Sequence, residues 1–374
     1  MVKVCHLSSG HSRNSGRIFN KQCCSLAKAG YDVSYVVADG QGFEEKSGVK
    51  VHDIGHYRGK YNRFVKARKH VFNKAKEIDA DIYHLHDLEL MPLVTKLRRL
   101  NKIVVFDSHE DLPQMILSRD YLTPFLRKII SLIISMVERK YLKKATCIVG
   151  ATPFISERLR KHYGRVVTIN NYPVMSQCAT HCDYQKEATE VVYIGAISKI
   201  RGIKQVIHAF DSPDVCARLN LVGRFSDKSL EEEVSSYEGW QKVNNIGFVD
   251  RSEVNKVLTR SRVGLVTFLP SPNHTDAQPN KMFEYMAAGI PVIASHFPLW
   301  KLIIEEAGCG LLVDPQNPQE IAKAITWIMN HPDQAAQMGR RGQQAVLKKY
   351  NWAVEEKALM AMYDTLFNPE QIAA

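Results

Sequence analysis

A lysine and a glutamate lie close to the start of a predicted helix in the segment PNKMFEYMAAGIPVIAS, residues 279–295. The proline at its start suits a first helical turn, where a missing N–H costs nothing. Gly289 and Pro291 end the helix, and IPVIAS is typical of a short buried parallel strand. Lys281 and Glu284 are therefore candidates to bind a ligand at the N-terminal end of this helix, although a charged residue on a helix is more often simply solvated.

The same half of the chain holds further residues of the types that bind a diphosphate. Gly195 follows a predicted strand in YIGAISKIRGI, and Arg201 opens the next helix, so a cation and free backbone amides come together there. Lys281 would add a second cation, and Glu284 would accept hydrogen bonds from ribose hydroxyls, as acidic residues do in dinucleotide sites. The predicted nucleotide-diphosphate pocket is completed by Gly223 and Asp276.

In the first half, the turn SSGHSRNSGR at 8–17 follows the first predicted strand and contains His11, Gly16 and Arg17. Its small residues allow backbone amides to approach a ligand, and the helix that follows offers a partial positive charge. No Gly-Lys-Ser/Thr follows, so the turn is not a P-loop, and it is not a clean GxGxxG either, so NAD binding is weakly supported.

Two histidine-containing segments also lie at predicted strand ends: HLHDLE, with His86 and Asp87, and FDSHEDLP, with His109 and Glu110. Because ligands of such sheets bind at the carboxyl ends of strands, these side chains are expected to converge at one edge. A metal site is conceivable from these ligand types. Hydrogen bonding to a polyhydroxyl acceptor is the more economical interpretation, and a structural role for either histidine remains open.

Strand-like and helix-like segments alternate along both halves of the chain, which is typical of parallel, doubly wound α/β sheets. The periodicity is lost at residues 171–189, which we interpret as a linker. The sequence therefore predicts two Rossmann-like domains, at 1–170 and 190–352, that face a deep cleft.

The net charge of +11 is unevenly distributed. Residues 1–187 hold 31 Lys and Arg against 18 Asp and Glu, whereas residues 188–374 hold 19 against 21. This excess in the first half suggests an anionic partner, namely a membrane surface, a phosphorylated acceptor or nucleic acid, or else a solvated basic face. Nucleic acid is disfavoured, because the basic segments lack interleaved aromatic residues.

The segment TPFLRKIISLIISMVERKYLKK at 123–144 contains nine residues, Ile129–Val137, that are apolar apart from two serines. This stretch is far too short to span a bilayer. With its basic flanks it could lie in a membrane interface, or it could be a buried helix of the first domain. We favour peripheral contact with an anionic membrane, which would suit a lipid-diphosphate-linked acceptor; soluble acceptors remain an alternative.

Eight cysteines lack a paired framework, and the chain starts with MVKVCHLSS rather than with the features of a signal peptide. Both observations predict reduced thiols and a cytoplasmic location. The CATHC segment at 178–182 has no second cysteine or histidine pair at zinc-finger spacing nearby, so we expect no metal there.

Taken together, these motifs resemble the family-four retaining glycosyltransferases of the GT-B fold, of the bacterial polysaccharide-biosynthesis type. PNKMFEYMAAGIPVIAS and EEAGCGLLVDPQNPQEIAKAI are the most specific segments, and RIF with AKAG and HLHD resembles a bacterial subgroup. The resemblance implies a nucleotide sugar, UDP- or GDP-linked, in the C-terminal domain and an acceptor in the N-terminal one. It also implies a final helix, within 353–374, that crosses back to the first domain, and no tightly bound cofactor or required metal.

The family's two-glutamate motif matches Glu284, which implies ribose contact, but its first position is occupied by Asp276, one methylene shorter. Where the family has glycine-arginine followed by lysine-glycine, this sequence has Gly195-Ala196 followed by Arg201-Gly202. One of the family's two cations is therefore missing and the other is exchanged, and Lys281 is the expected substitute for the missing one. The resemblance also places His109 on the acceptor side, near the donor sugar. The acceptor-binding residues we predict are His11, Arg17, His86, Asp87, His109 and Glu110, and Gly16 is predicted to approach the donor.

The resemblance implies front-face displacement, in which the leaving diphosphate helps to deprotonate the acceptor hydroxyl. Arg201 and Lys281 would then stabilise charge on the leaving group, and the sequence offers no obvious nucleophile and acid of the kind that retaining glycosidases use. The expected role is hexosyl transfer in capsule or lipopolysaccharide biosynthesis. Two alternatives remain: a nucleotide-sugar 2-epimerase of the same fold, and a catalytically degenerate transferase-like subunit, the latter suggested by Asp276 and Ala196.

Overall fold

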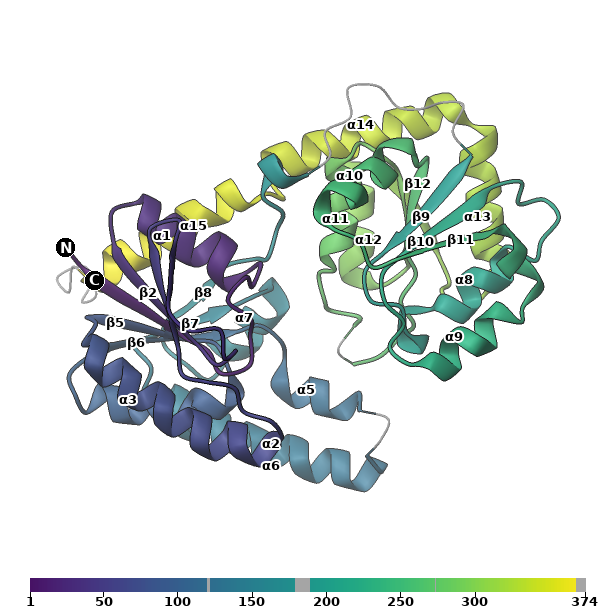
Figure 1. Ribbon diagram of the computed structural model, residues 1–374. Helices are drawn as coiled ribbons and strands as arrows, with labels where there is room; N and C mark the ends of the chain where they lie inside the picture. Colours follow the sequence, from purple (N-terminus) through teal and green to yellow (C-terminus); the bar gives the residue numbers. More distant parts are fainter. Residues whose placement is uncertain (120–121, 179–188, 273, 368–374) are drawn as a thin grey trace. The chain divides into compact units, whose positions relative to one another are not determined.

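The computed structural model describes residues 1–119, 122–178, 189–272 and 274–367, and the chain divides into two compact units (Figure 1). Unit 1 combines Met1–Asn171 with Trp352–Ala374, and unit 2 spans Tyr172–Asn351. Most of the segment interpreted as a linker, all of CATHC after its first cysteine, and the last residues of the predicted terminal segment lie outside the described residues.

Unit 1 is built on an eight-stranded sheet in the order β3-β4-β2-β1-β5-β6-β7-β8. All neighbouring strands are parallel except β3 and β4, which form an antiparallel pair that the sequence did not suggest. The strand order reverses between β1 and β5, so the loops after these two strands flank the crevice where such sheets bind ligands. The strands are Lys3–Leu7 (β1), Asp32–Val37 (β2), Glu44–Lys46 (β3), Val49–Asp53 (β4), Ile82–Leu85 (β5), Ile103–Ser108 (β6), Cys147–Gly150 (β7) and Val166–Thr168 (β8).

Helices cover both faces of this sheet, with α1 and α15 on one face and α3 and α6 on the other (Figure 1). Apolar side chains of the strands pack against α3, α4 and α7 to form the core of this unit. The helical segments are Ile18–Cys23 (η1), Cys24–Lys28 (α1), Lys60–Asn62 (α2), Arg63–Ala67 (η2), Arg68–Ile78 (α3), Leu88–Leu90 (η3), Met91–Arg98 (α4), Leu112–Leu117 (α5), Pro124–Leu142 (α6), Pro153–Arg160 (α7) and Trp352–Phe367 (α15).

The last helix, α15, is bound into unit 1 by polar contacts along its length. Trp352 Nε1 donates to Ser25 Oγ at 2.9 Å. The buried carboxylate of Glu355 accepts from the backbone N–H of Asn170 at 2.6 Å and from its side-chain amide at 3.0 Å. Burial raises the pKa of Tyr363 well above its ordinary value, so its phenol stays protonated for hydrogen bonding inside the unit.

Unit 2 is a six-stranded, fully parallel sheet in the order β11-β10-β9-β12-β13-β14. Its order reverses between β9 and β12, so the loops after those strands flank its crevice. The strands are Glu190–Ile194 (β9), Arg218–Val222 (β10), Val243–Gly247 (β11), Val263–Val266 (β12), Val292–Ser295 (β13) and Gly310–Val313 (β14). The helical segments are Met175–Gln177 (η4), Lys199–Arg201 (η5), Ile203–Ala209 (α8), Lys228–Ser235 (α9), Glu238–Lys242 (η6), Arg251–Arg260 (α10), Asn280–Ala287 (α11), Pro298–Ala307 (α12), Pro318–Asn330 (α13) and Pro332–Lys348 (α14).

The apolar segment near 123–144 forms α6, and one long face of this helix is open to solvent. Large apolar side chains on that face are exposed to between 38% and 72%: Phe125, Leu126, Ile129, Leu132, Ile133 and Met136. Only three side chains of the helix are buried, Ile134, Glu138 and Leu142. Among the described residues, no helix has both the length and the hydrophobicity needed to cross a membrane.

Candidate functional site

In unit 2, two cations meet in front of a glycine at the end of β9. A Cβ atom placed on Gly195 would lie 3.7 Å from Arg201 Nη1 and 3.8 Å from Lys281 Nζ. Gly195 has φ +106°, a left-handed conformation that favours glycine. The structure therefore brings together three residues that the sequence assigned to a diphosphate, and the absent side chain leaves room beside both positive charges.

Lys281 is buried, with 7% of its surface exposed, and its Nζ has no hydrogen-bond partner among the described residues. The amine lies 3.5 Å from the ring centroid of Tyr193 and 5.3 Å from that of Phe268. Burial, followed by repulsion from Arg201, holds the pKa of Lys281 well below its ordinary value. A buried amine beside a guanidinium is costly unless an anion joins them.

Further buried polar atoms without partners among the described residues lie between β12 and α11, in the segment that leads to Lys281. Burial lowers the pKa of His274 to about 4, so this imidazole is neutral. Its ring lies 4.9 Å from that of Phe268, between centroids. The unpartnered atoms are Thr267 Oγ1, Ser271 Oγ, His274 Nδ1 and Gln278 Oε1.

Two more glycines let backbone segments approach closely at this edge. A Cβ atom on Gly223 would lie 1.9 Å from the carbonyl oxygen of Gly195, and one on Gly202 would lie 2.0 Å from that of Thr267. Both glycines have positive φ, +152° and +76°. Gly223 thus lets the backbone after β10 approach Gly195, beside the two cations. Gly202 lets the start of α8 pack against the backbone just after β12.

The two acidic residues of this half have partners of their own. Glu284 Oε2 forms a 3.0 Å ion pair with Arg251 Nη1 of α10, and its side chain is 20% exposed. Asp276 Oδ2 accepts a 3.3 Å hydrogen bond from Thr275 Oγ1. A ribose that binds Glu284 would therefore share this carboxylate with Arg251, a residue that the sequence did not single out.

In unit 1, Asp87 fixes the loop that follows β1. Its Oδ2 accepts from Ser8 Oγ at 2.8 Å and from the backbone N–H groups of Ser9 and Gly10 at 2.6 and 3.1 Å. The carboxylate is buried, and all three of these bonds go to its Oδ2. Asp87 thus shapes the loop after β1, and its contact with an acceptor stays a prediction.

Arg17 and Asp107 form a buried, two-pronged ion pair. Arg17 Nε and Nη2 donate to the two carboxylate oxygens of Asp107 at 3.0 and 2.9 Å. Arg17 Nη1 donates to the Ile169 carbonyl at 2.9 Å. The side-chain amide of Gln22 donates to Asp107 Oδ2 at 2.7 Å. Burial alone would raise the pKa of Asp107, but Arg17 and His109 hold it well below its ordinary value. The guanidinium of Arg17 is buried against Asp107, and its contact with an acceptor stays a prediction.

Four histidines and a tyrosine form a chain of contacts behind the ends of β1, β5 and β6. His109 Nε2 lies 3.1 Å from His86 Nδ1, and His86 Nε2 lies 2.9 Å from His6 Nδ1. Tyr363 OH lies 3.4 Å from His6 Nε2 and 2.9 Å from His84 Nδ1. His86 is buried within this chain of contacts, and its contact with an acceptor stays a prediction.

The other predicted acceptor residues are at least partly accessible. His11 lies with its Nε2 3.5 Å from Asp87 Oδ1, and its ring centroid is 5.0 Å from that of His109. The side chain of His109 is 18% exposed, and Glu110 is exposed. Gly16, which we predicted to approach the donor, has open space at its Cβ position. An acceptor surface on unit 1 would thus be formed by His11, His109 and Glu110.

Two family models match this chain: the model described as Glycosyltransferase Family 4 matches residues 18–171, and that of Glycosyl transferases group 1 matches residues 183–345. Together they cover most of unit 1 and most of unit 2. The chain belongs to the glycosyltransferases that pair these two domains. This assignment agrees with the family resemblance found in the sequence.

Among similar proteins, this glycosyltransferase is 24% identical to a D-rhamnosyltransferase of Pseudomonas aeruginosa over 73% of its own length and 71% of that protein. It is also 24% identical to spore coat protein SA of Bacillus subtilis, over 46% of its own length and 48% of that protein. It thus spans only about half of the second relative.

Solved structures share the two-domain fold of this glycosyltransferase. Sucrose-phosphate synthase of Thermosynechococcus elongatus superposes with a TM-score of 0.82 at 19% identity and covers 99% of this chain and 100% of that one. HepE of Anabaena, solved in complex with UDP-glucose, has a TM-score of 0.74 at 14% identity and covers 98% and 100%. The predicted fold class, two parallel doubly wound domains of the GT-B type, is confirmed.

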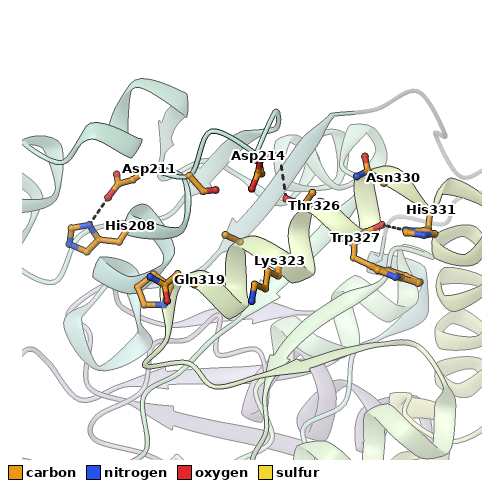
Figure 2. A pocket seen from close by; sticks show the side chains of 12 residues that line it. His208, Asp211, Asp214, Gln319, Lys323, Thr326, Trp327, Asn330 and His331 are labelled. Carbon is orange, nitrogen blue, oxygen red and sulfur yellow. Dashed lines mark hydrogen bonds and ion pairs between the residues drawn. The ribbon is translucent and has the colours of Figure 1, made fainter.

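A separate cavity of about 760 Å³ lies between α8 and α13 of this glycosyltransferase (Figure 2). It is lined by side chains that include His208, Asp211, Lys323 and Trp327, and none of its lining residues belongs to the site described above. His208 Nδ1 lies 2.9 Å from Asp211 Oδ2 at its edge. Because ligands of parallel α/β sheets bind at the carboxyl ends of the strands, we look for the chemistry there and not in this cavity.

Proposed function

We propose that this glycosyltransferase moves a hexosyl group, with retention of configuration, from a nucleotide-diphosphate sugar to a saccharide acceptor. The observation that carries the proposal is the buried, unpartnered amine of Lys281 beside Arg201 and Gly195. A diphosphate would supply the negative charge that this pair of cations requires. HepE, which shares the fold, was solved with UDP and with UDP-glucose, and this supports a UDP-sugar as donor, with a GDP-sugar as the other candidate.

The proposed reaction is a front-face displacement. The bond between the anomeric carbon and the diphosphate oxygen breaks, the acceptor hydroxyl oxygen bonds to the same face of that carbon, and the hydroxyl proton passes to the leaving diphosphate. Arg201 and Lys281 stabilise the negative charge that develops on the diphosphate, and no metal is needed for this role. Glu284 binds the ribose, while Gly223 and Asp276 line the donor pocket.

We place the saccharide acceptor on unit 1, at the accessible side chains of His11, His109 and Glu110. His109 is best suited to contact the reacting hydroxyl, because its ring is partly exposed while Asp107, 3.4 Å from its Nε2, fixes its orientation. The role that we propose is in surface polysaccharide biosynthesis, including capsule or lipopolysaccharide; the similarity to a D-rhamnosyltransferase supports the sugar transfer.

The donor site is tested with a thermal-shift panel of UDP, GDP, ADP, CMP and their sugar conjugates, each with and without EDTA. Selective binding to the folded state raises the melting temperature, so the stabilising nucleotide identifies the donor class. We expect a diphosphate to stabilise the protein equally with and without EDTA. If none of these nucleotides shifts the melting temperature, the donor site is refuted.

Catalysis is tested with Arg201→Ala in a transfer assay using the nucleotide sugar that the panel identifies. We expect turnover to fall on the order of a hundredfold, the loss typical of one preorganised charge stabiliser. Arg218→Ala is the matched control, because Arg218 is exposed at the opposite, N-terminal end of β10. Equal turnover of the two variants would contradict the role of Arg201.

We further propose that the exposed face of α6 rests on the inner surface of the cytoplasmic membrane, where a lipid-diphosphate-linked acceptor would be located. Phe125, Ile129, Leu132 and Met136 recur at helical spacing and are exposed. Exposed basic side chains lie beside and after this stripe: Lys128, Arg139, Lys140, Lys143 and Lys144. Apolar insertion combined with attraction to anionic headgroups is how interfacial helices bind.

Co-sedimentation with vesicles tests this surface. We expect the protein to bind vesicles that contain anionic lipid, to bind zwitterionic ones weakly, and to lose binding in the double variant Leu132→Glu, Met136→Glu. Leu302→Glu is the matched control, because Leu302 is 66% exposed in unit 2. Undiminished binding of the double variant, at an unchanged melting temperature, would refute α6 as the docking face.

A further inference from the structure

We propose that His86, Asp107 and His109 form a binding site in unit 1 for a divalent transition-metal ion, with Zn²⁺ as the representative ligand. His86 directly follows β5, Asp107 is the second-last residue of β6, and His109 directly follows β6. Their ligand atoms lie within 4.8 Å of one another. Two imidazoles and one carboxylate are a donor set that suits Zn²⁺ and other first-row ions rather than Mg²⁺ or Ca²⁺.

The spacing of the three ligand atoms carries the proposal. His86 Nδ1 and His109 Nε2 are 3.1 Å apart, His109 Nε2 and Asp107 Oδ2 are 3.4 Å apart, and His86 Nδ1 and Asp107 Oδ2 are 3.6 Å apart. A tetrahedral ion with bonds of about 2.0–2.1 Å separates its ligand atoms by about 3.3–3.4 Å. The three observed separations, 3.1, 3.4 and 3.6 Å, are thus close to those along one face of such a tetrahedron.

The hydrogen bonds behind the triangle give His86 the tautomer that a metal ligand needs. If His86 Nε2–H donates to His6 Nδ1, then His6 Nε2–H donates to Tyr363, and the Tyr363 hydroxyl donates to His84 Nδ1. Each contact then holds one proton, and His84 Nε2–H faces Asp107 Oδ2 at 3.9 Å. His86 Nδ1 is left as a free lone pair that faces the centre of the triangle, supported from behind as ligating histidines usually are.

The carboxylate of Asp107 is also held from behind. Arg17 binds both of its oxygens, and Gln22 donates to Oδ2, the oxygen that faces the two imidazoles. These contacts fix the orientation of the carboxylate, but the charge of Arg17 opposes a second cation. We therefore expect a site whose affinity lies below that of a structural zinc site.

Entry to the site is from the side of His109. His86 and Asp107 are buried, whereas the side chain of His109 is 18% exposed. The remaining coordination positions of the ion would face this opening and take water. A bound ion would hold the ring of His109 through Nε2 in the orientation that Asp107 already favours, and the proposed transfer does not depend on it.

The experiment uses the full chain, treated with EDTA, dialysed and then titrated with Co²⁺ in the absence of nucleotide. We expect one ion per chain, with the intense visible absorption of four- or five-coordinate Co²⁺, and displacement of this signal by Zn²⁺. His109→Ala and the more nearly isosteric His109→Asn should each weaken Co²⁺ binding at least tenfold. Circular dichroism of the ion-free variants shows that they are folded, and testing both prevents one folding defect from deciding the outcome.

His208→Ala is the matched control, since it removes the exposed histidine of the His208–Asp211 pair shown in Figure 2. It should bind Co²⁺ as tightly as the wild type. Equal binding by a folded His109 variant, or a loss of binding in His208→Ala alone, would overturn the proposal. Because no nucleotide is present, a negative result leaves the donor site in unit 2 untouched.

Discussion

Replacing Lys281 by methionine should affect ligand binding and stability in opposite directions. Methionine preserves most of the apolar stem but removes the amine, which lies against Tyr193 and Phe268 without a hydrogen-bond partner among the described residues. A hydrogen bond to a charged group contributes about 1.5–3 kcal/mol. We therefore expect the nucleotide diphosphate to bind Lys281→Met about 10- to 150-fold more weakly.

The ligand-free variant should be at least as stable as the wild type, because an unsatisfied buried polar group costs about 1–3 kcal/mol. Its stability should also lose a pH dependence. The folded pKa of Lys281 lies below its ordinary value of 10.5, so the folded protein binds fewer protons than the unfolded chain. The stability of the wild-type protein therefore increases as the pH rises from the folded pKa of Lys281 to its unfolded pKa. Lys281→Met removes this pH dependence.

Isothermal titration calorimetry measures the affinity, and thermal melts at several pH values measure the stability. Lys301→Met is the matched control: Lys301 lies on α12 in the same unit and pairs only loosely with Glu305, at 3.8 Å, on the surface. It should change neither quantity appreciably. A Lys281→Met protein with lower stability and unchanged nucleotide affinity would refute the reasoning, since it would show that the amine already has its partner inside the protein.

Three further predictions follow from individual contacts. Binding of the diphosphate should take up about one proton at a pH between the pKa values of Lys281 in the free and the bound protein. Calorimetry in two buffers of different ionisation enthalpy measures this proton uptake, and a binding enthalpy that is the same in both buffers would contradict the prediction. Glu355→Gln should destabilise the protein by about 1.5–3 kcal/mol in urea unfolding, because it weakens two bonds from Asn170, whereas Glu356→Gln should have little effect. Gly202→Ala should lower the free energy of unfolding by about 1–3 kcal/mol. The positive φ of Gly202 disfavours alanine, and an added Cβ would lie 2.0 Å from the Thr267 carbonyl oxygen. A variant that melts at the wild-type temperature would exclude this strain.

The sequence predicted the elements that short-range patterns determine. Buried parallel strands appear as apolar runs such as VKVCHL, and Gly195, Arg201 and Lys281 were recognisable because each lies beside a strand end or helix start. The β3–β4 pair was missed, because Glu44–Lys46 is polar and only three residues long. The exposure of α6 also lay beyond the sequence, since an apolar helix can equally be buried.

Contacts between distant residues could not be predicted. Arg251 and Glu284 pair across two helices of unit 2, and nothing in the local sequence of either residue indicates the other. His6 and Tyr363 are separated by 357 residues, so the histidine chain exists only once α15 packs on unit 1. His86 and Asp87 were expected to face an acceptor because polar residues at strand ends often do. Their buried contacts with His6, His109 and the loop after β1 could not be read from the sequence.

Arg17 and Lys281 show what distinguishes a structural cation from a ligand-binding one. Both were predicted as binding residues, and both are buried to nearly the same degree, with 6% and 7% of their surfaces exposed. The guanidinium of Arg17 is neutralised by Asp107 within the unit, so an added anion would gain little there. Lys281 has no such partner among the described residues and is repelled by Arg201, so an anion placed between them relieves a cost already present in the fold. Glu284 attracts the amine, but its effect on the pKa of Lys281 is smaller than those of burial and Arg201. The amine without a hydrogen-bond partner, more than the residue type or its burial, is why we propose the unit 2 strand ends as the donor site.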